Sequence, residues 1–270
     1  NIRVTLKIPS VDLSNDPAYL ERFLMEEWVA RRINSAHVMK AGLQSRKRNY
    51  LYTVTEYIEG QTLAQWLIDN PSPDLETVRH IIEQITAGLQ AMHRKEILHQ
   101  DLRPENVMID NNGTIKIIDF GAVRVAGIVE AENTLEQSAL PGTALYMAPE
   151  YFVGEVISTR SDLFSLAVIV YRMLSGRFPY GTQVAKCTTT SAQNKLTYQS
   201  VLDEEKAIPR WIDETLKKAL QPNPYKRYAE ISEFVYDLRK PNPNFLRRNQ
   251  PPLIERNPLR FWRTVSFMLT

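Results

Sequence analysis

The residues with the clearest capacity for chemistry lie in two short polar segments. Residues 99–110 read HQDLRPENVMID and place Asp101 and Asn106 close together between apolar stretches. A further carboxylate, Asp119, follows the apolar run TIKII. A carboxylate that accepts a proton, together with oxygen ligands for magnesium, is what phosphoryl transfer requires of a protein. Turn-capping aspartates and asparagines would account for either segment alone, but not for both together.

Three motifs occur in the order of the protein-kinase signature set: His99, Asp101 and Asn106, then Asp119-Phe120-Gly121, then Ala148-Pro149-Glu150. Over about residues 1–240 the chain therefore resembles a eukaryotic-like serine/threonine protein kinase. The resemblance implies that Asp101 orients the substrate hydroxyl and accepts its proton. It also implies that Asn106 and Asp119 hold the Mg²⁺ ions, or Mn²⁺ in their place, that bridge the phosphates of ATP.

Lys7, in the segment VTLK, matches the strand lysine that pairs with the α- and β-phosphates of ATP in this family. The helix predicted after it offers two adjacent glutamates as the partner of that lysine, Glu26 and Glu27. Glu26 has the family's spacing, and a shift of one residue turns a carboxylate about 100° around a helix. The resemblance favours Glu26 as the partner and leaves Glu27 on a solvated helix face.

The segment TVTEYIEG resembles the hinge that joins the two lobes of a kinase. Thr55 occupies the gatekeeper position beside the adenine site, and the backbones of Glu56 and Ile58 are expected to bond adenine. These contacts are made by the main chain, so the identities of the side chains scarcely test them.

The segment GTALYMAPE resembles the peptide-binding loop, in which Thr143 is the residue expected of serine/threonine kinases. The resemblance implies that Glu150 pairs with Arg227 and that Asp162 braces the catalytic loop. A small-molecule phosphotransferase generally lacks this segment, so the expected substrate is a protein.

Two residues of the catalytic loop depart from the usual pattern. Gln100 replaces the arginine that commonly binds a phosphate on the activation segment, about residues 119–150. That segment is therefore expected to be ordered without phosphorylation. Its glutamates are expected to face solvent or a partner. Arg103 replaces a lysine and keeps the positive charge expected beside the transferred phosphate, but with a planar guanidinium in place of a compact ammonium.

A third departure is that no G-x-G-x-x-G loop precedes Lys7, and the first glycine of the chain is Gly42. The strand with Lys7 is therefore expected to form a bare sheet edge. Either the parent chain continues upstream or this relative never had the loop. We favour an upstream continuation, because the other catalytic positions are filled, and we expect this piece alone to be inactive or weakly active.

The hydrophobic pattern predicts an α+β protein, and the resemblance implies a two-lobed kinase fold. Residues 1–57 form a truncated, strand-rich small lobe with one helix, residues 58–240 a mainly helical large lobe, and residues 241–270 an extended tail rich in proline and arginine. In the small lobe, residues 1–8 alternate as a strand whose apolar face meets the core opposite Lys7. Residues 37–44 and 49–57 are expected to form a hairpin, and a second hairpin turns at residues 111–113.

Composition narrows the remaining possibilities. A formal net charge of +2 gives no support to nucleic-acid binding. The single cysteine, Cys187, excludes an intramolecular disulfide and fits a reducing, cytoplasmic compartment.

The end of the chain, ERNPLRFWRTVSFMLT, places arginines and Trp262 before an apolar run. This pattern resembles the cytoplasmic edge of a membrane helix, but it equally fits an amphipathic helix folded on the large lobe. The segments HQDLRPEN, QTLAQWL and ERNPLRFW are similar to bacterial chains in which such a kinase follows a metal-dependent phosphatase domain. No phosphatase residue is present, so no phosphatase activity is assigned.

These observations predict a protein kinase that transfers the γ-phosphate of ATP to serine or threonine. The alternative is a pseudokinase that binds nucleotide or a partner and signals by its conformation. The alternative is opposed by the presence of the catalytic residues Lys7, Asp101, Asn106 and Asp119. It is compatible with Gln100 and with the missing glycine-rich loop.

Overall fold

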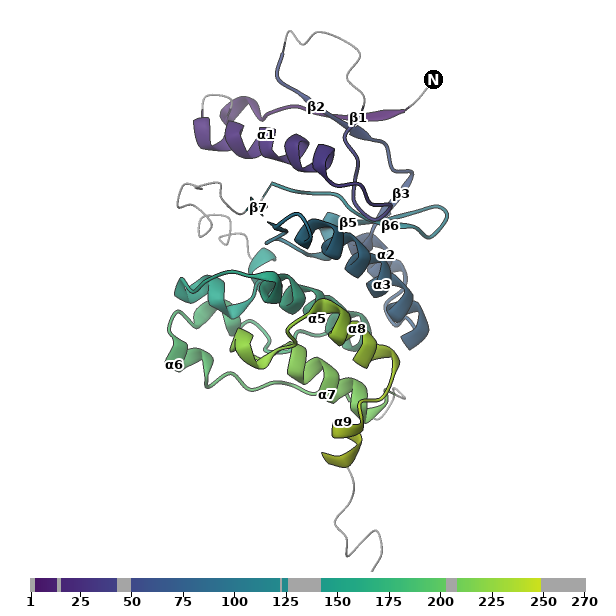
Figure 1. Ribbon diagram of the computed structural model, residues 1–270, viewed down its shortest axis with the longest axis vertical. Helices are drawn as coiled ribbons and strands as arrows, with labels where there is room; N and C mark the ends of the chain where they lie inside the picture. Colours follow the sequence, from purple (N-terminus) through teal and green to yellow (C-terminus); the bar gives the residue numbers. More distant parts are fainter. Residues whose placement is uncertain are drawn as a thin grey trace, which may run out of the picture.

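The computed structural model describes residues 3–13, 16–42, 50–121, 123–125, 142–202 and 208–248. A small lobe of strands and one long helix lies above a larger, mainly helical part (Figure 1). The α+β class expected from the sequence is confirmed.

The small lobe is built from β1 (Val4–Lys7), α1 (Pro17–Arg32) and β2 (Thr53–Glu56). The short 3₁₀ turn η1 (Val11–Leu13) leads into α1, which packs against β2. β1 and β2 pair antiparallel, with Lys7 opposite Thr53. The predicted first strand and the predicted helix are therefore both present.

The burial predicted for β1 is wrong. Val4, Leu6 and Ile8 are 43%, 62% and 71% exposed, whereas the sequence placed this apolar face against the core. Alternate residues of a strand point to opposite faces, and α1 packs on the face that carries Lys7. Within the described residues β1 pairs with β2 alone.

The first predicted hairpin forms only in part. Residues 37–42 make two isolated bridges, Val38 with Ile117 and Ala41 with Thr55, instead of a strand. This segment thus runs from the large lobe to β2, and the predicted turn at residues 43–49 lies outside the described residues.

In the large lobe, β3 (Gly60–Thr62), β5 (Val107–Asp110) and β6 (Ile115–Ile117) form an antiparallel sheet in the order β3-β5-β6. The β5–β6 hairpin predicted at residues 111–113 is confirmed, and Gly113 takes the φ of +80° that its turn requires. A second antiparallel pair consists of β4 (Ile97–Leu98) and β7 (Arg124–Val125). In the sequence, β4 comes just before the catalytic loop and β7 comes after Gly121.

Helices supply most of the large lobe. They are α2 (Leu63–Asp69), α3 (Leu75–His93), α5 (Thr159–Ser175), α6 (Thr190–Gln193), α7 (Arg210–Ala219), α8 (Ile231–Arg239) and α9 (Pro243–Arg248). The 3₁₀ turns are η2 (Pro104–Asn106), η3 (Thr143–Leu145), η4 (Pro149–Val153), η5 (Val184–Lys186) and η6 (Pro224–Lys226).

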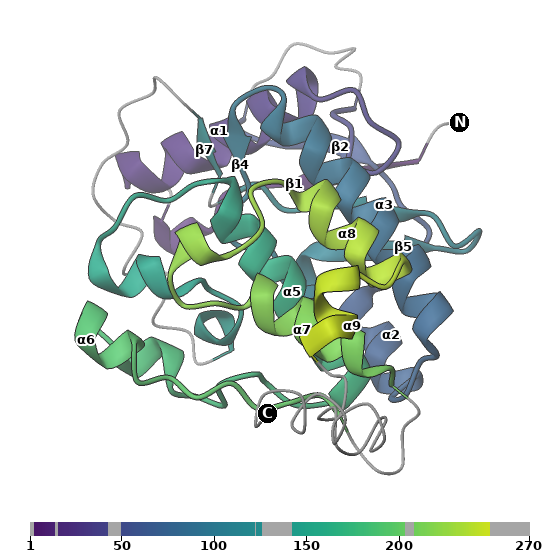
Figure 2. The ribbon, with the colours of Figure 1, turned by 60° about the horizontal axis from the view of Figure 1, so that its bottom comes forward.

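The central helix α5 is almost wholly buried, as its nearly uniform apolar sequence predicts. It packs against α3, α7 and α8, and Figure 2 shows it surrounded by these helices. Ser158 caps its first turn and Gly176, at φ +72°, ends it. Because α5 is fixed on all sides, a side chain near its start can hold a loop in place.

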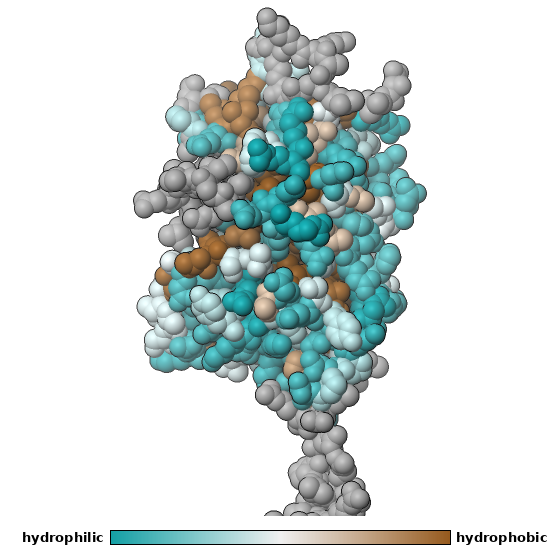
Figure 3. All heavy atoms as spheres, in the orientation of Figure 1, coloured by the Kyte–Doolittle hydropathy of each residue, from teal (hydrophilic) through white to brown (hydrophobic). Residues whose placement is uncertain are grey.

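The packed part of the chain extends beyond residue 240. Residues 243–248 form α9, which contacts α7 and buries Phe245, whereas the sequence assigned this segment to an extended tail. The face in Figure 3 is mostly hydrophilic, with apolar patches near the top over the small lobe and others lower down, at mid-height and in the centre. Among the described residues, no helix is long and apolar enough to cross a membrane. The segment with Trp262 lies outside them.

Candidate active site

Lys7 and Glu26 form an ion pair between β1 and α1. The Lys7 ammonium donates to both carboxylate oxygens of Glu26 at 2.7 Å. Glu27 instead accepts hydrogen bonds from Arg31 and is only 8% exposed, so the solvated face expected for it is wrong. The structure thus places Glu26, and not its neighbour, opposite Lys7.

The charges around this pair act on both groups. Burial alone would lower the pKa of Lys7, but the carboxylates of Glu26 and Asp119 raise it on balance. Burial raises the pKa of Glu26, Lys7 partly offsets that effect, and Asp119 adds to it. Asp119 therefore lies within electrostatic reach of the Lys7–Glu26 pair.

Asp101 and Asn106 are joined across the catalytic loop. The Nδ2 group of Asn106 donates to the main-chain oxygen of Asp101 at 2.8 Å and to its Oδ2 at 2.9 Å. Both amide protons of Asn106 are used in this way, which leaves its side-chain oxygen for a cation. Burial raises the pKa of Asp101, although His99, Arg103 and Asn106 partly oppose the shift.

Asp119 follows β6 and binds its own motif. Its Oδ1 accepts a hydrogen bond from the Gly121 amide at 2.9 Å. A Cβ at Gly121 would lie 3.0 Å from Glu26 Oε1 and 3.3 Å from Asp119 Oδ1, so the small residue allows these two carboxylates to approach. Within the described residues no group of three His, Cys, Asp or Glu side chains could hold a metal by itself. A metal here would therefore depend on Asn106, Asp119 and substrate oxygens.

Comparison with known proteins decides the family. The model for the protein kinase domain matches residues 3–236. The chain belongs to the protein kinase family.

The chain is similar to several bacterial serine/threonine-protein kinases. It is 25% identical to PrkC of Bacillus subtilis, 30% identical to PknL of Mycobacterium bovis and 30% identical to a probable PknB of Bifidobacterium longum. Each match covers 87% of this chain but only 36%, 58% and 35% of the respective relative. These matches concern the kinase part, so the phosphatase domain expected upstream stays a prediction.

The catalytic loop is braced from α5. The Asp162 carboxylate accepts hydrogen bonds from the amides of His99 and Gln100, each at 2.9 Å. The ring Nε2 of His93 lies 2.8 Å from the same carboxylate. Burial alone would raise the pKa of Asp162, but these partners hold it below the ordinary value. The predicted bracing role of Asp162 is confirmed.

Gln100 is buried in a constrained conformation. Its φ is +65°, its side chain is 4% exposed, and its Nε2 has no hydrogen-bond partner among the described residues. A neutral amide thus fills the place expected of a cation. The phosphate-independent activation segment stays a prediction, because residues 126–141, with their acidic side chains, lie outside the described residues.

Arg103 connects the catalytic loop to η3. Its Nη1 donates to the hydroxyl of Thr143 at 2.6 Å, and Thr143 is buried. The sequence singled out both residues but not their contact, which joins segments far apart in the chain.

The hinge residues lie at and after the end of β2. Thr55 is buried and Ile58 half-buried. The amide of Glu56 donates to the carbonyl of Lys40 at 3.0 Å, so only the carbonyl of Glu56 is left to bond adenine. The Glu56 carboxylate accepts hydrogen bonds from Lys116 at 2.9 and 3.0 Å, a contact that the sequence did not indicate.

The ion pair predicted between Glu150 and Arg227 is confirmed. The two side chains are fully buried, and Arg227 Nη2 lies 2.6 Å from Glu150 Oε2. Arg227 also donates to three main-chain carbonyls, and Ser161 donates to Glu150. The pair fixes η4, at the end of the activation segment, to η6.

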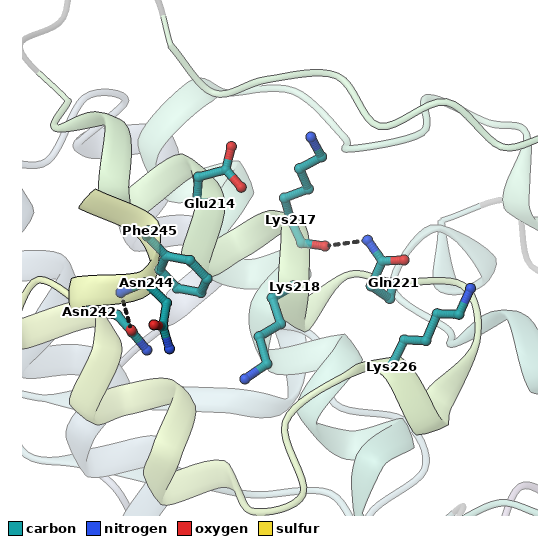
Figure 4. Close-up of a pocket in the computed structure, with 8 residues that line it drawn as sticks. All are labelled: Glu214, Lys217, Lys218, Gln221, Lys226, Asn242, Asn244 and Phe245. Carbon is teal, nitrogen blue, oxygen red and sulfur yellow. Dashed lines mark hydrogen bonds between the residues drawn. The ribbon is translucent and has the colours of Figure 1, made fainter. Parts of the chain in front are cut away.

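A separate groove of about 650 Å³ lies beside α7, η6 and the start of α9 (Figure 4). It is lined by Glu214, Lys217, Lys218, Gln221, Lys226, Asn242, Asn244 and Phe245. The three lysine side chains point away from one another, so they do not form a convergent anion site. None of the signature residues takes part in this groove.

Proposed function

We propose that this protein is a serine/threonine protein kinase that transfers the γ-phosphate of ATP to a protein hydroxyl. The Lys7–Glu26 ion pair, with the carboxylates of Glu26 and Asp119 both close to Gly121, is the observation that supports this most strongly. It places a cation of the small lobe near the carboxylate that follows β6. This combination suits a substrate with several phosphates.

In the proposed reaction Asp101 accepts the proton of the substrate hydroxyl. The freed oxygen forms a bond to the γ-phosphorus while the bond from that phosphorus to the β–γ bridging oxygen breaks, and ADP leaves. Lys7 holds the α- and β-phosphates. Arg103 places positive charge beside the transferred group, from a site fixed by Thr143.

The residues present fit magnesium, or manganese in its place. Asn106 keeps its side-chain oxygen for a cation, and Asp119 has one oxygen engaged by Gly121. Oxygen donors of this kind are those that Mg²⁺ prefers. When bound, the ion would neutralise charge on the phosphates.

Adenine binding is assigned to the hinge. The carbonyl of Glu56 and the backbone of Ile58 would bond the base, and Thr55 would lie beside it. The base would thereby be held between the two lobes, which orients the phosphates toward Lys7.

The wider setting of the kinase is part of the proposal. We place it in the cytoplasm and assign it protein substrates, an anchor at the cytoplasmic face of a membrane through residues 255–270, and a phosphatase domain upstream. The support is the single cysteine and the arginines and Trp262 that precede an apolar run.

The full-length protein tests the reaction directly. It is incubated with γ-labelled ATP, Mg²⁺ and a generic basic protein, and the phosphorylated product is hydrolysed to identify the modified residue. Label on serine or threonine is expected. Nucleotide binding with no more label than an Asp101→Asn variant gives would contradict the proposal and favour a pseudokinase.

A further inference from the structure

The carboxylate of Glu56 joins three segments of the chain. Lys116 Nζ contacts both of its oxygens, at 2.9 and 3.0 Å, and the main-chain amide of Lys40 donates to Oε1 at 2.8 Å. Glu56 ends β2 and begins the hinge, Lys116 lies at the centre of β6, and Lys40 belongs to the connecting segment 37–42.

Lys116 is held in place by the strand that carries it. Its neighbours Ile115 and Ile117 are buried on the opposite face, so the lysine side chain is directed to the hinge side. Its side chain is only 14% exposed and that of Glu56 only 30%. A charged contact of this burial is less screened by solvent than a pair on the surface.

The connecting segment is fixed at both ends. Ile117 exchanges main-chain hydrogen bonds with the segment at 3.0 and 2.8 Å, and the Gly42 amide donates to Val54 at 2.7 Å. Helix α3 supports it from behind, because a Cβ at Gly88 would lie 2.6 Å from the carbonyl of His37. The carboxylate of Glu56 is therefore bound by groups that β6 and the connecting segment hold in fixed positions.

We propose that Lys116 is a positioning residue for ATP. By holding the Glu56 side chain, it fixes the carbonyl of Glu56 in the orientation that bonds adenine, relative to the strand that leads to Asp119. This inference rests on the proposed function. When the ammonium is removed, the hinge samples other orientations, and ATP binds only the fraction that is competent.

Kinetics of the full-length protein test the role of Lys116. In Lys116→Met, KM for ATP should rise about three- to tenfold, as expected for loss of a charge-assisted contact, while kcat stays within about twofold. Glu56→Gln should give a similar rise, and the double variant should add little to it. Lys116→Arg should restore most of the affinity for ATP.

A second ion pair near the hinge supplies the matched control. Arg3 and Glu59 lie 3.6 Å apart and are 72% and 65% exposed, so Arg3→Met should leave KM unchanged. If Lys116→Met lowers thermal stability but leaves KM for ATP unchanged, Lys116 is only structural and the inference is wrong. A higher kcat at unchanged KM would also overturn it, because the pair would then restrain movement of the lobes.

Amide hydrogen exchange separates this inference from the proposed function. Lys116→Met should accelerate exchange at the Lys40 and Glu56 amides more than Arg3→Met does. If the unsubstituted protein binds no ATP but Lys116→Met still accelerates exchange at these amides, the proposed function fails and the contact still orders the hinge. Unchanged exchange would overturn the contact itself.

Discussion

Asp101 occupies surroundings that oppose its negative charge. Burial raises the pKa of its carboxyl, and the positive charge of Arg103 is one of the groups that counteract the shift. A proton acceptor works only when it is ionised, so the activity should rise with pH through the pKa of Asp101. The charge of Arg103 thus acts on the transferred phosphate and also on the pKa of Asp101, the proposed base.

Substitution of Arg103 tests this dual effect. Arg103→Ala should lower turnover about tenfold and move the acid limb of the kcat/KM profile to higher pH, because a charge that lowers the pKa of Asp101 is lost. Arg103→Lys keeps the charge and should keep the limb near its original position. The measurement is the pH profile of phosphate transfer for the three proteins. Equal rates and equal profiles would remove Arg103 from the mechanism.

Individual residues of the candidate site could be predicted where their positions depend on the spacing within one segment of the sequence. The helix spacing of the resembled family distinguished Glu26 from Glu27, and motif order identified Asp101, Asn106 and Asp119. The contacts of His93, Lys116 and Thr143 were not predictable, because each joins residues distant in the chain. A sequence alone does not give the packing that brings such residues together.

At the scale of elements, the sequence predicted a helix or turn well where the structure depends only on the residues of that segment. The apolar sequence of α5 and the turn between β5 and β6 each gave the observed element. The face of β1 was predicted incorrectly, because which face is covered depends on where α1 packs. Residues 37–42 likewise bridge to β6 instead of forming a regular strand, since their partner lies in the large lobe.

The attachment of the catalytic loop to α5 makes a prediction about stability. Asp162→Ala leaves the amides of His99 and Gln100 without their acceptor and should lower the free energy of unfolding by about 3 to 5 kcal/mol. Chemical denaturation measures the loss. Asp69→Ala is the control, because Asp69 is exposed and its loss should cost about 0.5 kcal/mol or less.

The same carboxylate predicts how stability depends on pH. The pKa of Asp162 in the folded state lies below its unfolded value of about 3.9. Its stabilisation is therefore present above about pH 4 and is lost as the pH falls through the folded-state pKa. Asp162→Ala should show a flatter acid dependence than the unsubstituted protein. An equally steep dependence would contradict this assignment.

At the scale of the whole molecule, the two lobes contribute different parts of the site. The small lobe supplies Lys7 and Glu26, and the large lobe supplies Asp101, Asn106 and Asp119. The hinge and segment 37–42 join the lobes, and the buried Glu150–Arg227 pair fixes the end of the activation segment to the helical core. Most elements of each lobe were predictable from their own patterns, but the contacts between the lobes were not.

The central claim is that Asp101 acts in phosphoryl transfer and not in nucleotide binding. Single-turnover transfer at saturating ATP and Mg²⁺ separates the two, with full-length protein and its Asp101→Asn variant. The account predicts that the rate falls by about 10²- to 10⁴-fold, while the affinity for ATP stays within about threefold. Equal single-turnover rates in the two proteins would contradict it.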